Sequence, residues 1–399
     1  MQKKLNLGVI LDRLDQTDGG KYVYQINLIR KIKKINQNYL NISFFYFNSI
    51  NKKNEEFTNE KLFKVNYGLL KKIIDLIFFK IFKLLNFNYY SFLDKYFLRK
   101  KIDLIYFLTP NHMALYTYNT HMINTVWDLF HMDGLEFPET GNFLPYNLRH
   151  QMLKKTLPRS VAIICDSFKT INKLSQNYLI DKKRCYKIDY TVPENLSQNN
   201  DENILTIKGF DLKKKYIFYP SQLWAHKNHI YILEALKIYN STYDEIFLLF
   251  SGSNKGNLEH INKVAKDLNV YKNIVYLDFV NKKELISLYK NALALVMPTY
   301  ALPTNIPPLE ALYLECPIIY SKTDENNELF YKDSLWEVDL NNPEDLSRTI
   351  LKINNNDNNI VQQKTKVGKS LLKNLNNNLE QETLNEIFIN FLSKRKTYK

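Results

Sequence analysis

Short apolar runs alternate along the chain with stretches that have helical spacing. Residues 5–11 are almost continuously apolar, and the polar loop that follows ends in Gly19 and Gly20. Residues 23–32 then place a valine and isoleucines at the spacing of one helical face. Strand, glycine-containing loop and helix are the opening unit of a doubly wound α/β domain, in which ligands bind at the carboxyl ends of the strands.

This alternation continues and then restarts, which predicts two parallel sheets covered by helices. Further strands are expected at residues 42–47, 102–107, 122–127, 161–165, 186–190, 216–219, 246–250, 274–277, 293–297 and 318–320. Residues 195–203 are rich in Asn, Gln, Asp and Ser and are the best candidate for a linker. We predict one Rossmann-like domain at residues 1–200, a second at 201–375, and a C-terminal helix at 376–399 that can pack back on the first domain.

A segment near residues 68–87 is both basic and apolar. Leucines and isoleucines recur at helical spacing, so one face carries no charge, and lysines occupy the other face together with Phe79 and Phe82. One interpretation is a helix that packs its apolar face on the core. The other is a helix that lies on an anionic membrane surface, which the lysines and the additional aromatic residues favour.

Composition limits the classes of partner. A chain of 399 residues usually contains two domains. Its net charge of +14 favours an anionic partner, but no nucleic-acid-binding motif is present, so we predict none of that class. Cys165, Cys185 and Cys316 share no short spacing, which argues against disulfides or a zinc site and predicts a cytoplasmic location. The first residues do not resemble a signal peptide, and the uncharged stretch at residues 104–127 is too polar for a transmembrane helix.

Polar residues follow several predicted strands. Lys227 directly precedes a helix that begins near Asn228. Its charge and the helical N–H groups can therefore bind the same phosphate. The alternative is that Lys227 is an ordinary exposed lysine in a loop. His131 and Asp128 follow the strand at 122–127. His131 can contact a substrate hydroxyl, with Asp128 orienting it or binding the acceptor, although a purely structural histidine is equally compatible with the pattern.

A proline-rich loop lies between the apolar run at 293–297 and a short helix. Its prolines favour extended or turn conformations, and Pro307 or Pro308 suits the first helical turn. The backbone N–H groups near the start of this helix would face a ligand, with the carboxylate of Glu310 one step inside. The N–H groups in question belong to Asn305, Ile306 and Leu309.

Together these features resemble the retaining glycosyltransferases of family four, the group 1 type with the GT-B fold. That fold has two Rossmann-like doubly wound parallel-sheet domains that face a cleft. The resemblance rests on Gly19-Gly20 and on the segments 127–131, 136–139, 221–228 and, above all, 305–311.

The resemblance also implies roles for residues of the second domain. In the family a motif of two glutamates with seven residues between them binds the donor, and the second glutamate holds the ribose. Glu310 matches the second glutamate, whereas Leu302 stands at the first, and Thr304 and Asn305 are the expected substitutes. Gln222 replaces an arginine that usually shares the diphosphate with the lysine, and Glu315 replaces a glycine. The implied donor-binding residues are Gly19, Gly20, Gln222, Lys227, Asn228, Thr304, Asn305, Ile306, Leu309 and Glu310, and the implied catalytic residues are His131, Asp128 and Lys227.

The activity implied is transfer of a sugar, for example mannose, from a nucleoside diphosphate sugar to an acceptor hydroxyl with retained configuration. No Asp-x-Asp pair is present to clamp a metal-bound diphosphate, so we expect neither a metal nor a cofactor. The first domain would bind a saccharide or lipid-linked saccharide acceptor at the inner face of the cell membrane, in polysaccharide biosynthesis. Two alternatives stay open, a nucleotide-sugar epimerase of the same fold and a non-catalytic, basic membrane-associated binding protein.

Overall fold

The computed structural model divides the chain into two compact α/β units. It describes residues 4–35, 37–47, 57, 60–192, 196, 204–301, 306–355, 358–374 and 379–398. Unit 1 comprises Met1–His131, Phe143–Asp189 and Asn377–Lys399, and unit 2 comprises Met132–Asn142 and Tyr190–Asn376. Each unit is built on a parallel sheet, which confirms the predicted fold class. The predicted boundary near residue 200 and most of the linker at 195–203 lie outside the described residues.

The sheet of unit 1 has the strand order β3-β2-β1-β4-β5-β6-β7. From β1 the chain proceeds to β2 on one side, and from β4 to β5 on the other, so the connections change direction between β1 and β4. A topological switch point of this kind is where open α/β sheets bind ligands. The strands are β1 (Leu5–Leu11), β2 (Leu40–Tyr46), β3 (Leu62–Lys64), β4 (Leu104–Phe107), β5 (Met122–Val126), β6 (Ala162–Cys165) and β7 (Cys185–Lys187).

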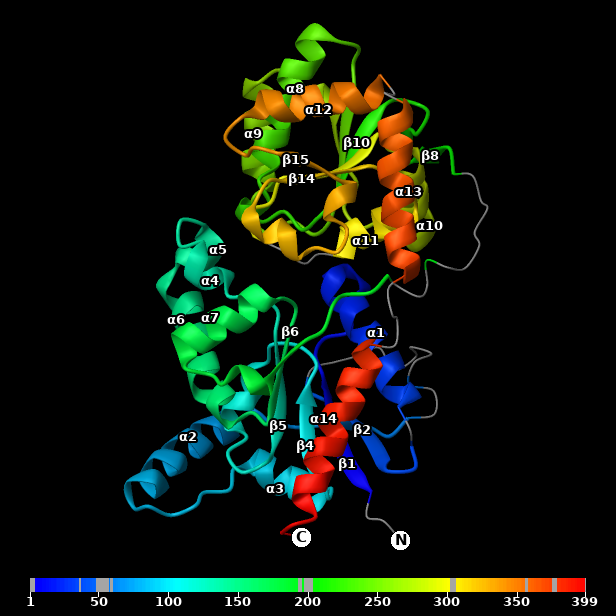
Figure 1. Cartoon of the computed structure of the whole chain (residues 1–399). Helices are drawn as coiled ribbons and strands as arrows, with labels where there is room; N and C mark the ends of the chain where they lie inside the picture. Colours follow the sequence, from blue (N-terminus) through cyan, green and yellow to red (C-terminus); the bar gives the residue numbers. More distant parts are fainter. Residues whose placement is uncertain are drawn as a thin grey trace. The chain divides into compact units, whose positions relative to one another are not determined.

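The principal helices of unit 1 come from both ends of the chain. They are α1 (Gly20–Lys34), α2 (Leu69–Leu84), α3 (Phe92–Arg99), α4 (Phe130–Asp133), α6 (Phe143–Thr156), α7 (Phe168–Tyr178) and α14 (Leu379–Arg395). Helix α14 packs beside α1 (Figure 1) and buries Leu384 and Phe388. Its two ends are held by buried ion pairs, which join Glu380 to Lys31 and Arg395 to Asp103.

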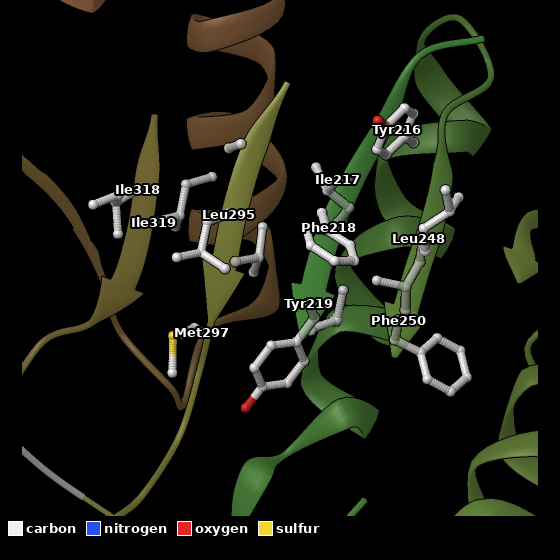
Figure 2. Close-up of a cluster of buried hydrophobic side chains, with 14 of the residues drawn as sticks. Tyr216, Ile217, Phe218, Tyr219, Leu248, Phe250, Leu295, Met297, Ile318 and Ile319 are labelled. Atoms are coloured by element: carbon white, nitrogen blue, oxygen red, sulfur yellow. The ribbon is translucent and has the colours of Figure 1, made fainter. Parts of the chain in front are cut away.

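The sheet of unit 2 has the order β12-β11-β10-β13-β14-β15, with its switch point between β10 and β13. Its strands are β10 (Tyr216–Pro220), β11 (Phe247–Ser251), β12 (Ile274–Tyr276), β13 (Ala294–Met297), β14 (Ile318–Ser321) and β15 (Leu335–Val338). Successive residues of a strand point to opposite faces, and side chains on both faces of β10 are buried, as Figure 2 shows for residues between Tyr216 and Tyr219. The sequence did not predict β15, a four-residue strand with mixed burial.

The helices of unit 2 are α5 (Pro138–Gly141), α8 (His229–Thr242), α9 (Leu258–Asp267), α10 (Lys282–Asn291), α11 (Ile306–Tyr313), α12 (Pro343–Asn354) and α13 (Asn358–Asn374). A small antiparallel pair joins β8 (Thr206–Ile207) and β9 (Phe210–Asp211). Helix α13 crosses close to α11, where a Cβ atom at Gly368 would lie 2.3 Å from Leu312. The short segment Met132–Asn142, which the sequence predicts within the first domain, groups with unit 2 instead.

Among the described residues, no helix is both long enough and apolar enough to cross a membrane.

Candidate functional site

The predicted site residues fall into two groups, one at the carboxyl edge of each sheet. In unit 2, the loops that follow the adjacent strands β10 and β13 touch each other. The backbone N–H of Tyr300 donates to the carbonyl of His226 at 3.0 Å, and the Thr299 hydroxyl donates to the same carbonyl at 3.4 Å. Because these loops meet at the switch point, their side chains share the position at which this class of sheet binds ligands.

The loop after β10 carries Gln222, Lys227 and Asn228. Lys227 ends a short 3-10 helix (Ala225–Lys227), and its carbonyl accepts a hydrogen bond of 2.9 Å from the Tyr219 hydroxyl. Asn228 has a φ of 56°, in the left-handed region, and α8 begins at the next residue. The predicted position of Lys227 directly before a helix N-terminus is therefore present. Gln222 is held by Trp224, whose indole N–H donates to the Gln222 side-chain oxygen at 3.0 Å.

The loop after β11, which the sequence did not predict as part of the site, lies against this segment. Gly252 has a φ of 140°, and a Cβ atom there would lie 2.3 Å from the carbonyl oxygen of Ser221. Only glycine allows this approach of two backbones. Within the described part of the chain, the buried Ser253 hydroxyl and the Asn228 side-chain nitrogen have no hydrogen-bond partner. The chain has only ten glycines, a scarcity that makes each of them informative and could have pointed to Gly252.

Glu310 lies inside α11 and is only 7% exposed. The hydroxyl of Tyr289, from α10, donates to its carboxylate at 2.8 Å. Burial raises the pKa of Glu310 to about 7, although the Tyr289 hydrogen bond opposes this shift. Glu310 therefore exchanges its proton near neutral pH, which is unusual for a carboxyl group.

The proline-rich loop before α11 is described only in part. Ile306 and Leu309 belong to the first turn of α11, where Pro307 and Pro308 have no N–H to donate. The predicted donor contacts at Thr304 and Asn305, and Leu302 in the place of the first glutamate, lie outside the described residues.

The segment Met132–Asn142 brings an unpredicted carboxylate to the site of unit 2. The Glu139 carboxylate accepts hydrogen bonds from the backbone N–H of His226 at 2.9 Å and lies 2.5 Å from the His226 ring nitrogen Nδ1. Burial opposes ionisation, but these donors outweigh it and hold the pKa of Glu139 below its ordinary value. The Phe137 ring lies 5.3 Å from that of Tyr300. Glu139 thus fixes the residue that precedes Lys227.

In unit 1, Asp128 follows β5 and pairs with Arg149 of α6 at 2.8 Å. The backbone N–H of Phe130 also donates to its carboxylate at 2.8 Å. Partial burial works against ionisation, but the Arg149 guanidinium and this N–H outweigh it and keep the pKa of Asp128 below its ordinary value. Asp128 is therefore a fixed negative charge at the carboxyl edge of the sheet.

His131 lies on α4 and is buried beside the Tyr146 ring. Burial lowers its pKa to about 3, so the imidazole is neutral at physiological pH. Within the described residues, neither of its ring nitrogens has a hydrogen-bond partner. Buried polar atoms are seldom left unpaired, and two unpaired nitrogens on one ring are compatible with contact to a substrate.

The predicted glycines lie at the amino end of α1. Gly19 has a φ of 58°, and Gly20 is the first residue of the helix. Nearby, the Asp12 carboxylate pairs with Lys21 at 2.6 Å. These features do not test whether either glycine contacts the donor, so their predicted role in donor binding stays a prediction. The part of the chain that the structure describes contains no group of three or more metal-binding side chains.

Part of the chain matches a known protein family. Residues 200–370 match the family model described as glycosyl transferases group 1, and this region includes Gln222, Lys227 and Glu310. A curated relative, the O-antigen chain mannosyltransferase RfbU of Salmonella typhimurium strain LT2, is 24% identical over 213 residues. The match covers 51% of this chain and 57% of the relative, so it spans little more than half of either protein.

Solved structures share the fold over nearly the whole chain. Anabaena Alr3699/HepE in complex with UDP and glucose has a TM-score of 0.69 at 12% identity, covering 98% of this chain and 99% of that one. WaaG, a glycosyltransferase involved in lipopolysaccharide biosynthesis, has a TM-score of 0.69 at 11% identity, covering 96% and 99%. A glycosyltransferase from Rickettsia africae ESF-5 has a TM-score of 0.65 at 15% identity, covering 98% and 99%. The chain thus has the GT-B fold, and its residues 200–370 match the glycosyl transferases of group 1.

Proposed function

We propose that the protein is a retaining, metal-independent glycosyltransferase that moves a sugar from a nucleoside diphosphate sugar to an acceptor hydroxyl. The observation that carries this proposal is the contact, at the switch point of unit 2, between the loop that carries Lys227 and the loop after β13, the strand that precedes the Glu310 helix. Both lie inside the region that matches the glycosyl transferases of group 1.

On the donor side, each group has a distinct role. The ionised Glu310 carboxylate accepts hydrogen bonds from the ribose hydroxyls. Lys227 and the N–H groups in the first turn of α11 stabilise the charge that develops on the departing diphosphate. Because a lysine and backbone donors supply this stabilisation, the reaction as proposed does not use a metal ion. Glu139 positions His226, and through it the loop that carries Lys227.

On the acceptor side, the neutral His131 imidazole contacts a hydroxyl group, and Asp128 supports the acceptor. The bond between the anomeric carbon and the phosphate oxygen breaks while the acceptor oxygen bonds to the same carbon on the same face. The acceptor's proton passes to the departing phosphate oxygen, so no carboxylate nucleophile takes part. The enzyme contributes orientation and charge stabilisation.

The acceptor that we propose is a saccharide or a lipid-linked saccharide. One relative is named for O-antigen chain synthesis, and one structural neighbour for lipopolysaccharide biosynthesis. A further neighbour was solved with UDP and glucose. By analogy, we propose a hexosyl donor and a role in cell-surface polysaccharide biosynthesis in the cytoplasm. The comparisons do not favour an epimerase or a non-catalytic protein over this activity.

The proposal can be tested by incubating the purified protein with a panel of nucleoside diphosphate sugars and saccharide acceptors. Released nucleoside diphosphate reports turnover, and analysis of the recovered donor reports epimerisation. Transfer product with retained configuration, formed in the presence of a chelator, would support the proposal. Epimerised donor without transfer would contradict it, as would the absence of thermal stabilisation by millimolar nucleoside diphosphates.

Two substitutions test the proposed donor site. Glu310→Ala should raise the donor's Kd about 10- to 100-fold, because a charged hydrogen-bond acceptor is lost. Lys227→Ala should lower kcat by a similar factor without a matching loss of stability. Glu315→Ala and Lys369→Ala are matched controls, since these residues form an exposed ion pair in the same unit. Unchanged nucleotide affinity in Glu310→Ala would exclude the ribose contact.

A further inference from the structure

Helix α2 turns its apolar side away from unit 1. Ile77 is 51% exposed and Ile81 46% exposed, and the other large side chains on the same side are exposed as well, namely Leu70, Ile73 and Leu84. Figure 1 shows the helix at the periphery of its unit. The interpretation in which α2 packs this face on the core is therefore wrong.

A single carboxylate anchors the opposite side of the helix. Asp75 is the one described residue of α2 that is buried. Its carboxylate accepts hydrogen bonds from the hydroxyls of Tyr67 at 2.7 Å and Tyr89 at 2.6 Å, and from the backbone N–H of Phe92 at 3.1 Å. By the helical period, Ile77 lies on the far side of the helix from Asp75.

Aromatic stacking explains the phenylalanines on the lysine-bearing side of α2. The Phe79 ring stacks on Tyr118 with a centroid distance of 4.0 Å, and Phe82 lies 5.3 Å from Tyr89. These contacts lie on the same side as Asp75. The helix is therefore held to the protein by a buried acid and aromatic rings, while its aliphatic residues stay in contact with solvent.

The surface around α2 is positive. Between residues 61 and 102 the acidic residues are Asp75 and Asp94, and both are buried and hydrogen-bonded. The basic side chains of the same stretch are exposed or half-exposed; they are Lys61, Lys64, Lys71, Lys72, Lys80, Lys83, Lys95, Arg99, Lys100 and Lys101. An exposed aliphatic face within a region whose exposed charges are all positive complements an anionic lipid surface.

We infer that α2 docks the protein on a membrane, with its aliphatic face in the headgroup region and its lysines on anionic lipid. A second copy of the chain is the less favourable occupant, because a symmetric interface would bring these lysines toward one another. The inference does not depend on the sugar chemistry, so vesicle binding and glycosyl transfer can fail separately.

Flotation with vesicles tests the inference. The full chain is mixed with vesicles of phosphatidylcholine alone, or of phosphatidylcholine with phosphatidylglycerol, and the bound fraction is measured. We expect binding to the anionic vesicles, with a loss of about fivefold in affinity for each of Lys80→Gln and Lys83→Gln. The double variant Ile77→Glu/Ile81→Glu should lose binding, because it places two carboxylates on the inserted face.

The matched control is Ile360→Glu/Ile389→Glu. These isoleucines are 51% and 46% exposed, the same values as Ile77 and Ile81, but they lie on α13 and α14. The control should bind anionic vesicles as the unaltered protein does. Circular dichroism and light scattering should show folded monomers for both double variants.

Three outcomes would overturn the inference. The unaltered protein could fail to bind anionic vesicles. The control could lose binding as completely as Ile77→Glu/Ile81→Glu does. Finally, the unaltered protein could be a dimer that binds no vesicles and that the α2 substitutions convert to a monomer, which would make the aliphatic face of α2 an interface between copies.

Discussion

At the scale of single residues, the surroundings of Glu310 favour its protonated form. The ordinary pKa of a glutamate is 4.5, and burial raises that of Glu310 to about 7. Between these pH values the native protein binds more protons at this position than the unfolded chain does. The contribution of Glu310 to the free energy of unfolding therefore falls as the pH rises from about 5 to 7.

This linkage gives a first prediction. In the unaltered protein, the free energy of unfolding should fall by about 2–3 kcal/mol over this pH range because of Glu310. Glu310→Gln should not show this fall, because glutamine carries no titrating proton. Urea denaturation at several pH values, with and without the substitution, measures the difference. Glu315→Gln, at an exposed position of the same unit, is the control. Identical slopes for Glu310→Gln and the unaltered protein would contradict the raised pKa.

Glu315 gives a second prediction at this scale. It follows α11 with a φ of 58°, a conformation that costs a residue with a Cβ atom more than it costs glycine. The family resemblance places glycine at this position. Glu315→Gly should therefore stabilise the protein by about 0.5–1 kcal/mol, less the contribution of the exposed ion pair with Lys369. The shift in the urea midpoint measures this change in stability. Lys369→Ala removes the ion pair alone and so separates its contribution from the backbone effect.

At the scale of elements, Asp75 determines how α2 is attached to unit 1. Asp75→Ala would leave the hydroxyls of Tyr67 and Tyr89 without their acceptor. We predict a loss of about 3 kcal/mol in the free energy of unfolding, measured by urea denaturation. Asp75→Asn retains one acceptor oxygen and should lose less. An unchanged stability in Asp75→Ala would mean that stacking alone holds the helix.

Strands and helices were predictable from the sequence where one local pattern determined them. The apolar runs around β1, β5 and β13 are long enough to identify buried strands, and the structure confirms them. The orientation of α2 was not predictable in this way. Its aliphatic stripe has the spacing of a core-facing helix, and only the contacts of Asp75 with residues outside α2 show that the opposite side faces the protein.

The residues of the candidate site likewise differ in how well a local pattern predicts them. Lys227 and Glu310 stand next to strand ends and helix starts, which a local pattern can identify. Glu139 contacts His226 across 87 residues of sequence, and Tyr289 contacts Glu310 across 21. Neither contact leaves a periodic signal. The unpaired nitrogens of His131 likewise became visible only from its burial in the structure.

At the scale of the whole molecule, α14 follows unit 2 in the sequence but packs on unit 1. The Arg395 guanidinium pairs with Asp103, and both side chains are less than one-tenth exposed. Arg395→Met should destabilise unit 1 by about 3 kcal/mol, because it leaves the Asp103 carboxylate buried without its cation. The double variant Arg395→Met/Asp103→Asn should recover most of this loss. Thermal unfolding measures both, and equal losses in the two variants would mean that packing around Arg395, not charge, is responsible.

The return of α14 also affects the order in which the protein can fold as it is synthesised. Domains commonly fold from the N-terminus onward while the ribosome is still elongating the chain. Here unit 1 contains Met1–His131, which precede unit 2 in the sequence, and also Asn377–Lys399, which follow it. The whole of unit 2 is therefore synthesised before α14, the helix that packs on α1 of unit 1. Until α14 has been made, the surface of α1 that it covers stays exposed, so unit 1 is begun before unit 2 and completed after it.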